Sequence, residues 1–153
     1  MIKSIFSKLL LDIIDHINNT MPEIRWVDRY LGQDQVAIRP AIASPAVLVD
    51  IDSETYSNLA GFSQYVDAAT ISVRLLVDNF SASSAKAPQK AKECAMSDFE
   101  LEKVLVDRLH GWTPTDNYCG PLIRTSASSE NRNDIGLRIR TITFTTSFED
   151  IDV

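Results

Sequence analysis

The segment TISVRLLVDNF, residues 70–80, is the most regular strand pattern in the sequence and decides the fold. Strongly apolar side chains recur at every second position, which is the period of a strand that buries one face. These side chains are Ile71, Val73, Leu75 and Val77. A strand of this kind belongs to a sheet with one apolar face, and such a face needs other elements to cover it.

An amphipathic helix over residues 2–18 is the first candidate for that cover. Its apolar side chains recur at the i, i+3, i+4 spacing of one helix face. They are Ile2, Ile5, Phe6, Leu9, Leu10, Ile13, Ile14 and Ile17. Leu11 is the one apolar residue on the polar side, which hints at a contact beyond this fold. The polar residues 18–20 and Pro22 end the helix.

The remaining elements follow in the order strands, helix, two strands. We expect strands over residues 24–30, 36–39 and 46–51 before the central strand. A second helix runs to about His110 and starts either near Pro88 or at the capping box Ser97-x-x-Glu100. Two final strands, 122–126 and 137–148, are joined by a polar turn at 128–134.

Short turns between strands imply antiparallel pairing. The sequence therefore predicts an α+β fold, a mainly antiparallel sheet covered by two amphipathic helices. In the last strand the apolar phase shifts from Leu137 and Ile139 to Ile142 and Phe144, which indicates a bulge or a burial that changes face midway. We expect a single domain over 1–153, with a long connection at 53–69 and a polar loop at 79–90.

Composition argues against several classes of protein. The chain has 153 residues, of which 44% are hydrophobic and 24% charged, as in an ordinary globular protein. Its net charge of −6 gives no generic attraction to nucleic acid or anionic lipid. Cys94 and Cys119 are too few for a disulfide framework and are expected to be separate reduced thiols. No apolar stretch is long enough to span a membrane, so we expect no membrane association.

Patterns that carry catalytic or metal chemistry are weak in this sequence. Asp12 and His16 share a helix face, but a metal site needs three or four ligands, so a place at the rim of the core is favoured. The carboxylates of Asp50-x-Asp52-x-Glu54 either bind a divalent ion or form a solvated strand end. His110 is expected to cap its helix. We therefore predict no catalytic, cofactor-binding or metal-binding residue and no enzyme.

Seven residues are candidates for contacts with other subunits or partners: Leu11, Tyr56, Phe62, Tyr65, Arg124, Arg138 and Arg140. The arginines form either a basic patch for a phosphate or a neighbour's carboxylates, or ordinary pairs with Glu130, Asp134 or Glu149. If they pair across subunits, Arg140→Glu weakens assembly and leaves the stability of the subunit unchanged. The aromatic residues of 53–69 form either a protein contact or an anchor for the loop.

With this order of elements, the chain resembles the tail terminator, or tail completion, proteins of long-tailed bacteriophages and their prophages. The resemblance rests on the apolar N-terminal helix 2–17, the strand ISVRLLV at 71–77 and the polar loop that leads into the second helix. It also includes the helix end VDRLHGW at 106–112 and the segment DIGLRIRTITF at 134–144, and its most specific parts are LHGW at 109–112 and the D-x-G-L entry to the last strand at 134–137. It covers residues 2–17 and 70–148, whereas residues 31–69 depart from the pattern.

The resemblance implies a structural protein of the virion. Proteins of that family form a ring, usually a hexamer, that caps the tail tube and joins it to the head. The expected partners are further copies of the chain, the tail-tube protein and the head-closure or neck protein. DNA passes through the ring without specific binding, and a net acidic chain is compatible with that passage. The expected location is the head–tail junction of a virion made in the bacterial host cytoplasm, with no cofactor.

Two alternatives stay open. One is a related phage neck, head-closure or tail-tube subunit, and an open helical tube in place of a closed ring would mark the tube version. The other is a small α+β ligand-binding or enzymatic domain, whose site would use the carboxylates at 50–54 or the three arginines.

Overall fold

The computed structural model describes residues 1–35, 41–78 and 83–153. Its helices are α1 (Ile5–Thr20), α2 (Gln89–Ala95) and α3 (Ser97–Leu109). Its strands are β1 (Trp26–Arg29), β2 (Ala46–Asn58), β3 (Gln64–Asp78), β4 (Ile123–Arg132) and β5 (Leu137–Asp150). Short 3-10 turns at Ala60–Phe62 and Asn133–Ile135 close the hairpins β2–β3 and β4–β5. The predicted α+β class is confirmed.

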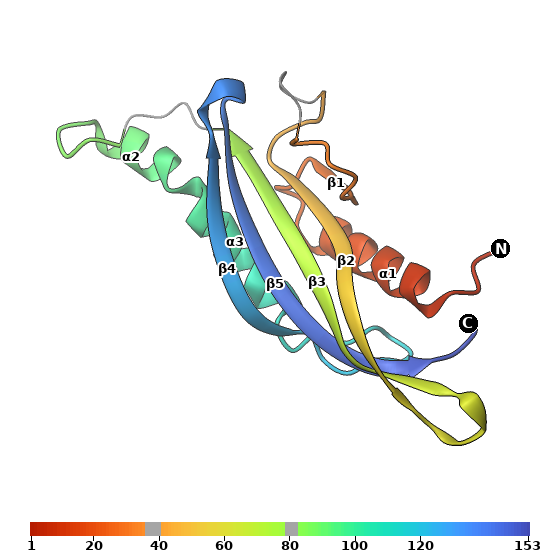
Figure 1. The fold of residues 1–153 in the computed structure, drawn as a ribbon. Helices are drawn as coiled ribbons and strands as arrows, with labels where there is room; N and C mark the ends of the chain where they lie inside the picture. The colour runs from red at the N-terminus through yellow and green to blue at the C-terminus, as the bar shows by residue number, and fades with distance from the viewer. Residues whose placement is uncertain (36–40, 79–82) are drawn as a thin grey trace.

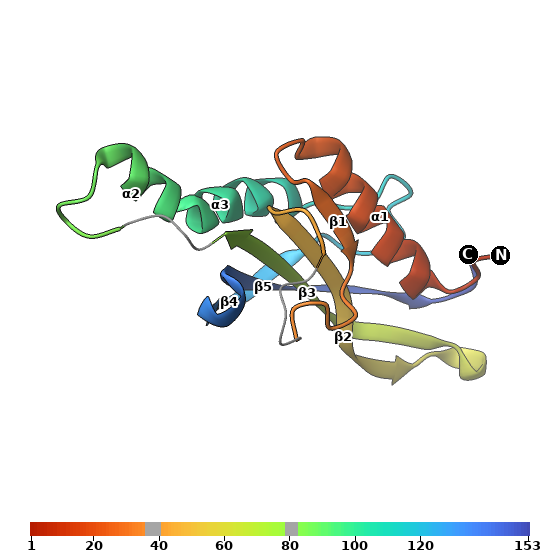
Figure 2. The same ribbon diagram turned by 90° about the horizontal axis from the view of Figure 1, so that it is seen from above.

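The strands form one sheet in the order β1-β2-β3-β5-β4 (Figure 1). The pairs β2–β3, β3–β5 and β5–β4 are antiparallel, while β1 runs parallel to β2. The parallel pair departs from the expectation of antiparallel neighbours, because the chain between Arg29 and Ala46 is long enough for a return connection. α1 and α3 lie on the same face of the sheet (Figure 2), which is the predicted helical cover.

Residues 53–69, predicted as a long connection, are instead the outer part of the β2–β3 hairpin. β2 continues to Asn58 and β3 begins at Gln64, with these two residues paired. The pairing shifts register between Ile51 and Ser53 and again between Thr55 and Tyr56. Each shift resets the two-residue alternation, so the strand pattern is invisible in the sequence even though the strands are continuous.

The predicted polar turn at 128–134 is also mostly strand. β4 extends to Arg132, and only Asn133–Ile135 and Gly136 turn the chain. The sequence of β4 is polar because residues 123–131 are all exposed at the edge of the sheet. The predicted strand 36–39 and the first residues of the predicted loop 79–90 lie outside the described residues. Residues 83–88 are loop, and α2 starts at Gln89.

The second predicted helix is divided at Met96, the cap residue shared by α2 and α3. Ser97 is the first residue of α3 and makes no capping hydrogen bond, so the predicted capping box is wrong. α1 starts later than predicted, with Ser4 as its cap: the Ser4 Oγ accepts from the Phe6 N–H at 3.2 Å. Gly111, after α3, has a φ of 79°, the left-handed conformation in which glycine often ends helices.

The main core lies between the sheet and the two covering helices. α1 contributes a fully buried stripe of Ile5, Leu9, Ile13 and Ile17. Alternate residues of β3 face this stripe, and they are the same ones that the sequence pattern selected. Phe144 and Phe148 of β5 are the largest buried side chains in this layer. The central strand is thus covered as predicted.

A smaller apolar cluster occupies the opposite face of the sheet. It contains Ala46, Leu48, Leu76, Ile135, Leu137 and Ile139. Leu137 and Ile139 therefore face away from the helices, whereas Ile142 and Phe144 of the same strand face them. This change of buried face within β5 is the predicted reason for the shift in apolar phase.

Phe144→Ala should reduce the free energy of unfolding by about 3–5 kcal/mol, because the ring is fully buried between the sheet and the helices. Leu11→Ala, on the exposed side of α1, is the control and should change that free energy by less than about 0.5 kcal/mol. Chemical denaturation followed by circular dichroism measures both. Equal losses would mean that the helical layer does not cover the sheet as described.

Candidate functional site

Two ion pairs attach the first half of α3 to β5. Arg140 Nε and Nη2 donate to the Glu102 carboxylate at 2.8 and 3.1 Å, and Arg138 Nε donates to Asp98 at 3.2 Å. Asp98 and Glu102 are both buried on the sheet-facing side of α3. The hydrogen bonds to Glu102 stabilise the charged guanidinium of Arg140, and they raise the pKa of Arg140 above its ordinary value. Arg138 and Arg140 are therefore paired within the subunit.

The partners of these arginines differ from the predicted Glu130, Asp134 and Glu149. A spacing match in the sequence could have identified them. Four residues of a helix rise about 6 Å and two residues of a strand rise about 6.7 Å. Acidic residues at 98 and 102 of a helix therefore fit basic residues at 138 and 140 of a strand. The match was not predicted, because the sequence analysis considered only acidic residues near the last two strands as partners.

Arg124, the third candidate arginine, does not join the other two. It lies opposite Phe144 in the β4–β5 ladder, whereas Arg140 lies opposite Ser129. Its backbone N–H donates to His110 Nδ1 at 3.1 Å, so His110 links the end of α3 to the start of β4. The Arg124 side chain is exposed and forms no ion pair within the part of the chain that the structure describes.

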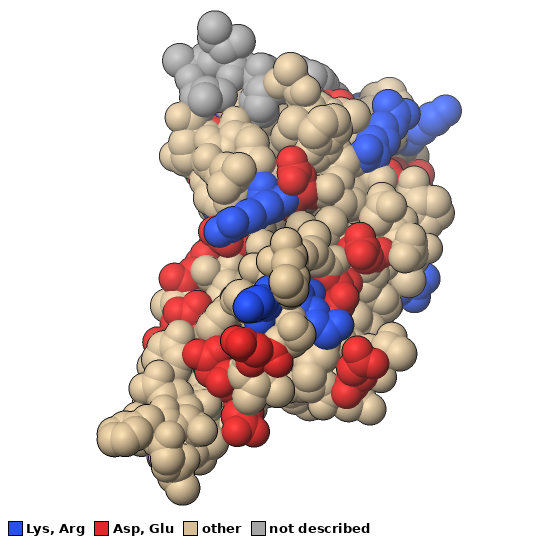
Figure 3. All heavy atoms as spheres, turned by 90° about the vertical axis from the view of Figure 1, so that its right-hand side faces the viewer, with Lys and Arg blue, Asp and Glu red and all other residues tan. Residues whose placement is uncertain are grey.

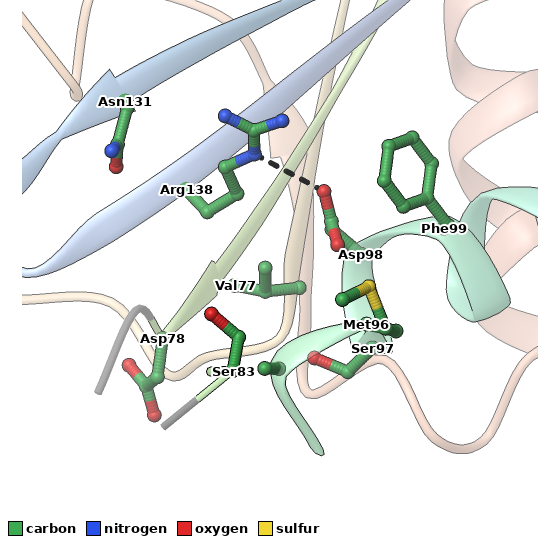
Figure 4. A pocket seen from close by; sticks show the side chains of 10 residues that line it. Val77, Asp78, Ser83, Met96, Ser97, Asp98, Phe99, Asn131 and Arg138 are labelled. Atoms are coloured by element: carbon green, nitrogen blue, oxygen red, sulfur yellow. Dashed lines mark hydrogen bonds and ion pairs between the residues drawn. The ribbon is translucent and has the colours of Figure 1, made fainter. Parts of the chain in front are cut away.

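A hollow of about 230 Å³ lies beside the Asp98–Arg138 pair, between the end of β3 and the start of α3 (Figure 4). Figure 4 shows the guanidinium of Arg138 turned toward the Asp98 carboxylate, with Met96 and Phe99 on the helix side. Because Arg138 and Asp98 form an ion pair with each other, this pair mainly joins α3 to β5.

A second hollow, of about 400 Å³, separates α1 from the loop that follows α3. The His16 ring stacks on Trp112 with 4.4 Å between ring centres, and His16 Nε2 donates to the Arg108 carbonyl at 2.9 Å. Asp12 accepts from the Tyr118 hydroxyl at 2.5 Å. Burial, and then this hydrogen bond, raise the pKa of Tyr118 above its usual range. Asp12 and His16 bind groups of the protein itself, as the rim-of-core interpretation predicted.

The carboxylates at 50–54 do not converge on one point. Asp50 pairs with Arg29 at 3.5 Å, while Asp52 accepts from the Ser72 hydroxyl. Among residues 1–35, 41–78 and 83–153, no three His, Cys, Asp or Glu side chains are placed to hold a metal ion. Cys94 is exposed, and burial raises the pKa of the Cys119 thiol, which favours its neutral form. The described residues thus do not bring the carboxylates at 50–54 together, which was one of the two sites considered for the ligand-binding alternative.

A buried ion pair on the helix-free face of the sheet was not predicted. Asp34, in the loop after β1, is fully buried, and Arg74 Nε donates to it at 3.0 Å. The Tyr30 hydroxyl donates to the same carboxylate at 2.9 Å, and its ring lies under the Arg74 guanidinium. This pair attaches the loop to the middle of the sheet. The sequence signal was an arginine inside the most apolar strand.

We name residues 55–66 of the β2–β3 hairpin the arm. Its base is paired with β5 through residues 64–66, and its tip projects beyond the rest of the sheet (Figures 1 and 2). Phe62, at its tip, is fully exposed with a relative exposure of 101%. Tyr56 and Leu59 are also exposed, and Tyr65 is half-buried. Leu11 is exposed on the outer side of α1. Phe62 is thus not packed against the body of the subunit, and Tyr56 is only partly covered.

Within residues 1–35, 41–78 and 83–153, two edges of the sheet are open. β4 is the last strand on one side of it. On the other side, β1 covers β2 only from Ala46 to Val49. Among the described residues, the outer edge of β2 from Asp50 to Asn58 has no neighbouring strand. Such edges carry backbone N–H and C=O groups that can pair with another chain.

No protein-family model matches the chain, and no curated protein matches its sequence. Among solved structures, it is similar to a chain described as "Virion of native gene transfer agent (GTA) particle". The TM-score is 0.56, and the match covers 95% of this chain and 98% of that chain at 10% sequence identity. The two chains therefore share a fold over nearly their whole length. Within the described residues, no helix has the length and apolarity needed to cross a membrane.

Arg140→Glu should destabilise the subunit itself by about 3–5 kcal/mol, because it places a carboxylate against the buried Glu102. This expectation reverses the one drawn from the sequence, in which Arg140 was free to pair across subunits. Arg124→Glu is the matched variant and should change the free energy of unfolding by less than about 0.5 kcal/mol. Urea denaturation of both variants tests the assignment, and a neutral Arg140→Glu would contradict the α3–β5 pairing.

Proposed function

We propose that this chain is a structural, non-enzymatic virion protein: a tail terminator that forms a ring, caps the tail tube and joins it to the head. The observation that carries the proposal is the shared fold with a chain of a gene transfer agent virion, over 95% of this chain. The resemblance of residues 2–17 and 70–148 to tail terminator proteins supports the finer assignment.

The direction of the strands supports assembly by head-to-tail contacts. β2, β3, β5 and β4 alternate in direction, so β4 is antiparallel to β2. A second copy beside the first, in the same orientation, brings its open β2 edge against β4 with the polarity of an antiparallel sheet. Repetition of one such contact with a constant rotation closes a ring, which we propose to contain six copies.

The helix-free face of the sheet supports a role as the wall of a DNA passage. Hydroxyl side chains of three adjacent strands share this face: Ser72, Ser126, Ser128, Thr141 and Thr143. Arg74, on the same face, is paired with Asp34 and Glu130 and is not available to phosphates. A net charge of −6 adds weak repulsion. We propose that DNA passes along this face without specific binding.

In this proposal the ring stands at the head–tail junction of the virion, after synthesis in the bacterial host cytoplasm. The tail-tube protein contacts one rim and the head-closure or neck protein contacts the other. No cofactor takes part. Leu11 and the arm are the exposed apolar groups that we propose for contacts between copies or with these partners.

The purified protein should form discrete closed rings of about six copies, or a monomer that closes into rings at high concentration. Light scattering gives the mass and negative-stain images give the shape. Open helical tubes would identify the tail-tube alternative instead. A monomer at every concentration that retains a metal ion or metabolite would contradict the proposal and favour the ligand-binding alternative.

A further inference from the structure

The arm contains no charged side chain. Residues 55–66, TYSNLAGFSQYV, contain no Asp, Glu, Lys or Arg, although 24% of the chain is charged. Glu54 and Asp67 stand directly on either side of this stretch. In Figure 3 the arm is the uncoloured protrusion at the lower edge, below a body that carries many charged side chains. A neutral segment of this kind can be buried against a protein without desolvation of an ion.

The tip of the arm holds its phenylalanine outward. Gly61 and Phe62 have φ values of 71° and 66°, so two successive residues are left-handed. This conformation suits glycine but is unfavourable for phenylalanine. A strained, fully exposed aromatic side chain at the end of a projecting hairpin is typical of an element that contacts another molecule.

A hollow lies beside the start of β4. It has a volume of about 260 Å³ and is lined by Ala68, Gly120, Pro121 and Ile123, with Asp67 and the polar residues 145–147 of β5 completing its wall. Ile123 is 45% exposed at its rim. A side chain at Gly120 would already contact the Ser147 backbone carbonyl and hydroxyl at 3.6 Å, so glycine keeps this wall of the hollow low.

The polarity of the strands places this hollow next to the arm of a neighbouring copy. When the β2 edge of one copy runs antiparallel to β4 of the next, Asn58 at the end of β2 lies toward Ile123 at the start of β4. The tip at Gly61–Phe62 then extends past the pairing edge toward the hollow. Within one copy, β3 and β5 separate β2 from β4.

Charge complementarity supports the same arrangement. The β2 edge that leads into the arm carries Asp50, Asp52 and Glu54, and the start of β4 carries the exposed Arg124. The same antiparallel contact places Arg124 on the β4 edge that faces this acidic edge of the neighbouring copy. This is the one exposed arginine of the three candidates, and an acidic edge is a suitable partner for it.

We infer that the arm of each copy docks beside the start of β4 in the next copy, with Phe62 in the hollow at Gly120, Pro121 and Ile123. The inference rests on the proposed ring and deepens it, because it names the contact that links one copy to the next. The arm then acts as a clasp that adds apolar contact to the pairing of the two sheet edges.

A cysteine pair tests the contact directly. In a Cys94→Ser background, Phe62→Cys is combined with Ile123→Cys, and the rings are treated with a short bismaleimide. The matched control combines Phe62→Cys with Met96→Cys, since Met96 is also 45% exposed but lies between α2 and α3. We expect a ladder of covalent oligomers up to the full ring for the first pair and none for the control.

The outcomes separate this inference from the proposed function. Rings that form without 62–123 cross-links, or that cross-link through position 96, overturn the docking of the arm and leave the ring proposal standing. A protein that forms no rings at any concentration overturns both.

Phe62→Ser provides a second measurement that does not depend on engineered cysteines. The concentration at which rings half-assemble should rise about tenfold or more, because an aromatic anchor is lost from the interface. The melting temperature of the dilute subunit should stay unchanged, since the side chain is fully exposed. Leu31→Ser, at an exposed apolar side chain outside the arm, is the control and should leave assembly unchanged. Normal assembly of Phe62→Ser would contradict the inference.

Discussion

Burial of the helix-facing side of β3 and β5 under α1 and α3 is the interaction on which the rest of the structure depends. β3 pairs with a strand on each side, and its alternate residues meet the buried stripe of α1. At the start of β5 the apolar residues turn to the other face, and the pairs of Arg138 and Arg140 with α3 take their place. Apolar packing and ion pairs thus hold one continuous helical layer against the sheet.

This division of roles explains which surface is left for partners. Charged groups that looked available in the sequence, such as Arg138, Arg140, Asp12 and His16, are engaged inside the subunit. The exposed groups include the two sheet edges, the arm and Arg124. A subunit with a well-satisfied interior and long unpaired edges is suited to contact with copies of itself.

The sequence predicted the parts of the fold that rest on simple periodicity. The stripe of α1, the alternation of Ile71 to Val77 and the change of buried face in β5 were all readable, because each follows from a regular spacing of apolar residues. The arm was not predicted because two register shifts in the β2–β3 pairing break the alternation within a few residues. β4 was shortened because an exposed edge strand has no apolar face to reveal it.

The candidate contact residues also differ in whether their local sequence reveals their role. Exposure of Tyr56 and Phe62 agrees with a contact role, whereas the pairing of Arg138 and Arg140 depends on a helix about 40 positions earlier in the chain. The pattern of the strand alone does not reveal such a partner, and only a comparison of its spacing with that of the helix could have done so. The Asp34–Arg74 pair was unpredictable for the same reason, since a loop aspartate and a strand arginine meet only after the sheet has formed.

Hydrogen exchange of the assembled protein against the dilute subunit tests the central claim most directly, because it reports on the backbone of both edges at once. If copies join edge to edge, amides of β4 and of the outer edge of β2 at 50–58 become protected on assembly, together with those around residues 120–123. Protection confined to α1 and α3, with both edges still exchanging freely, would contradict the account.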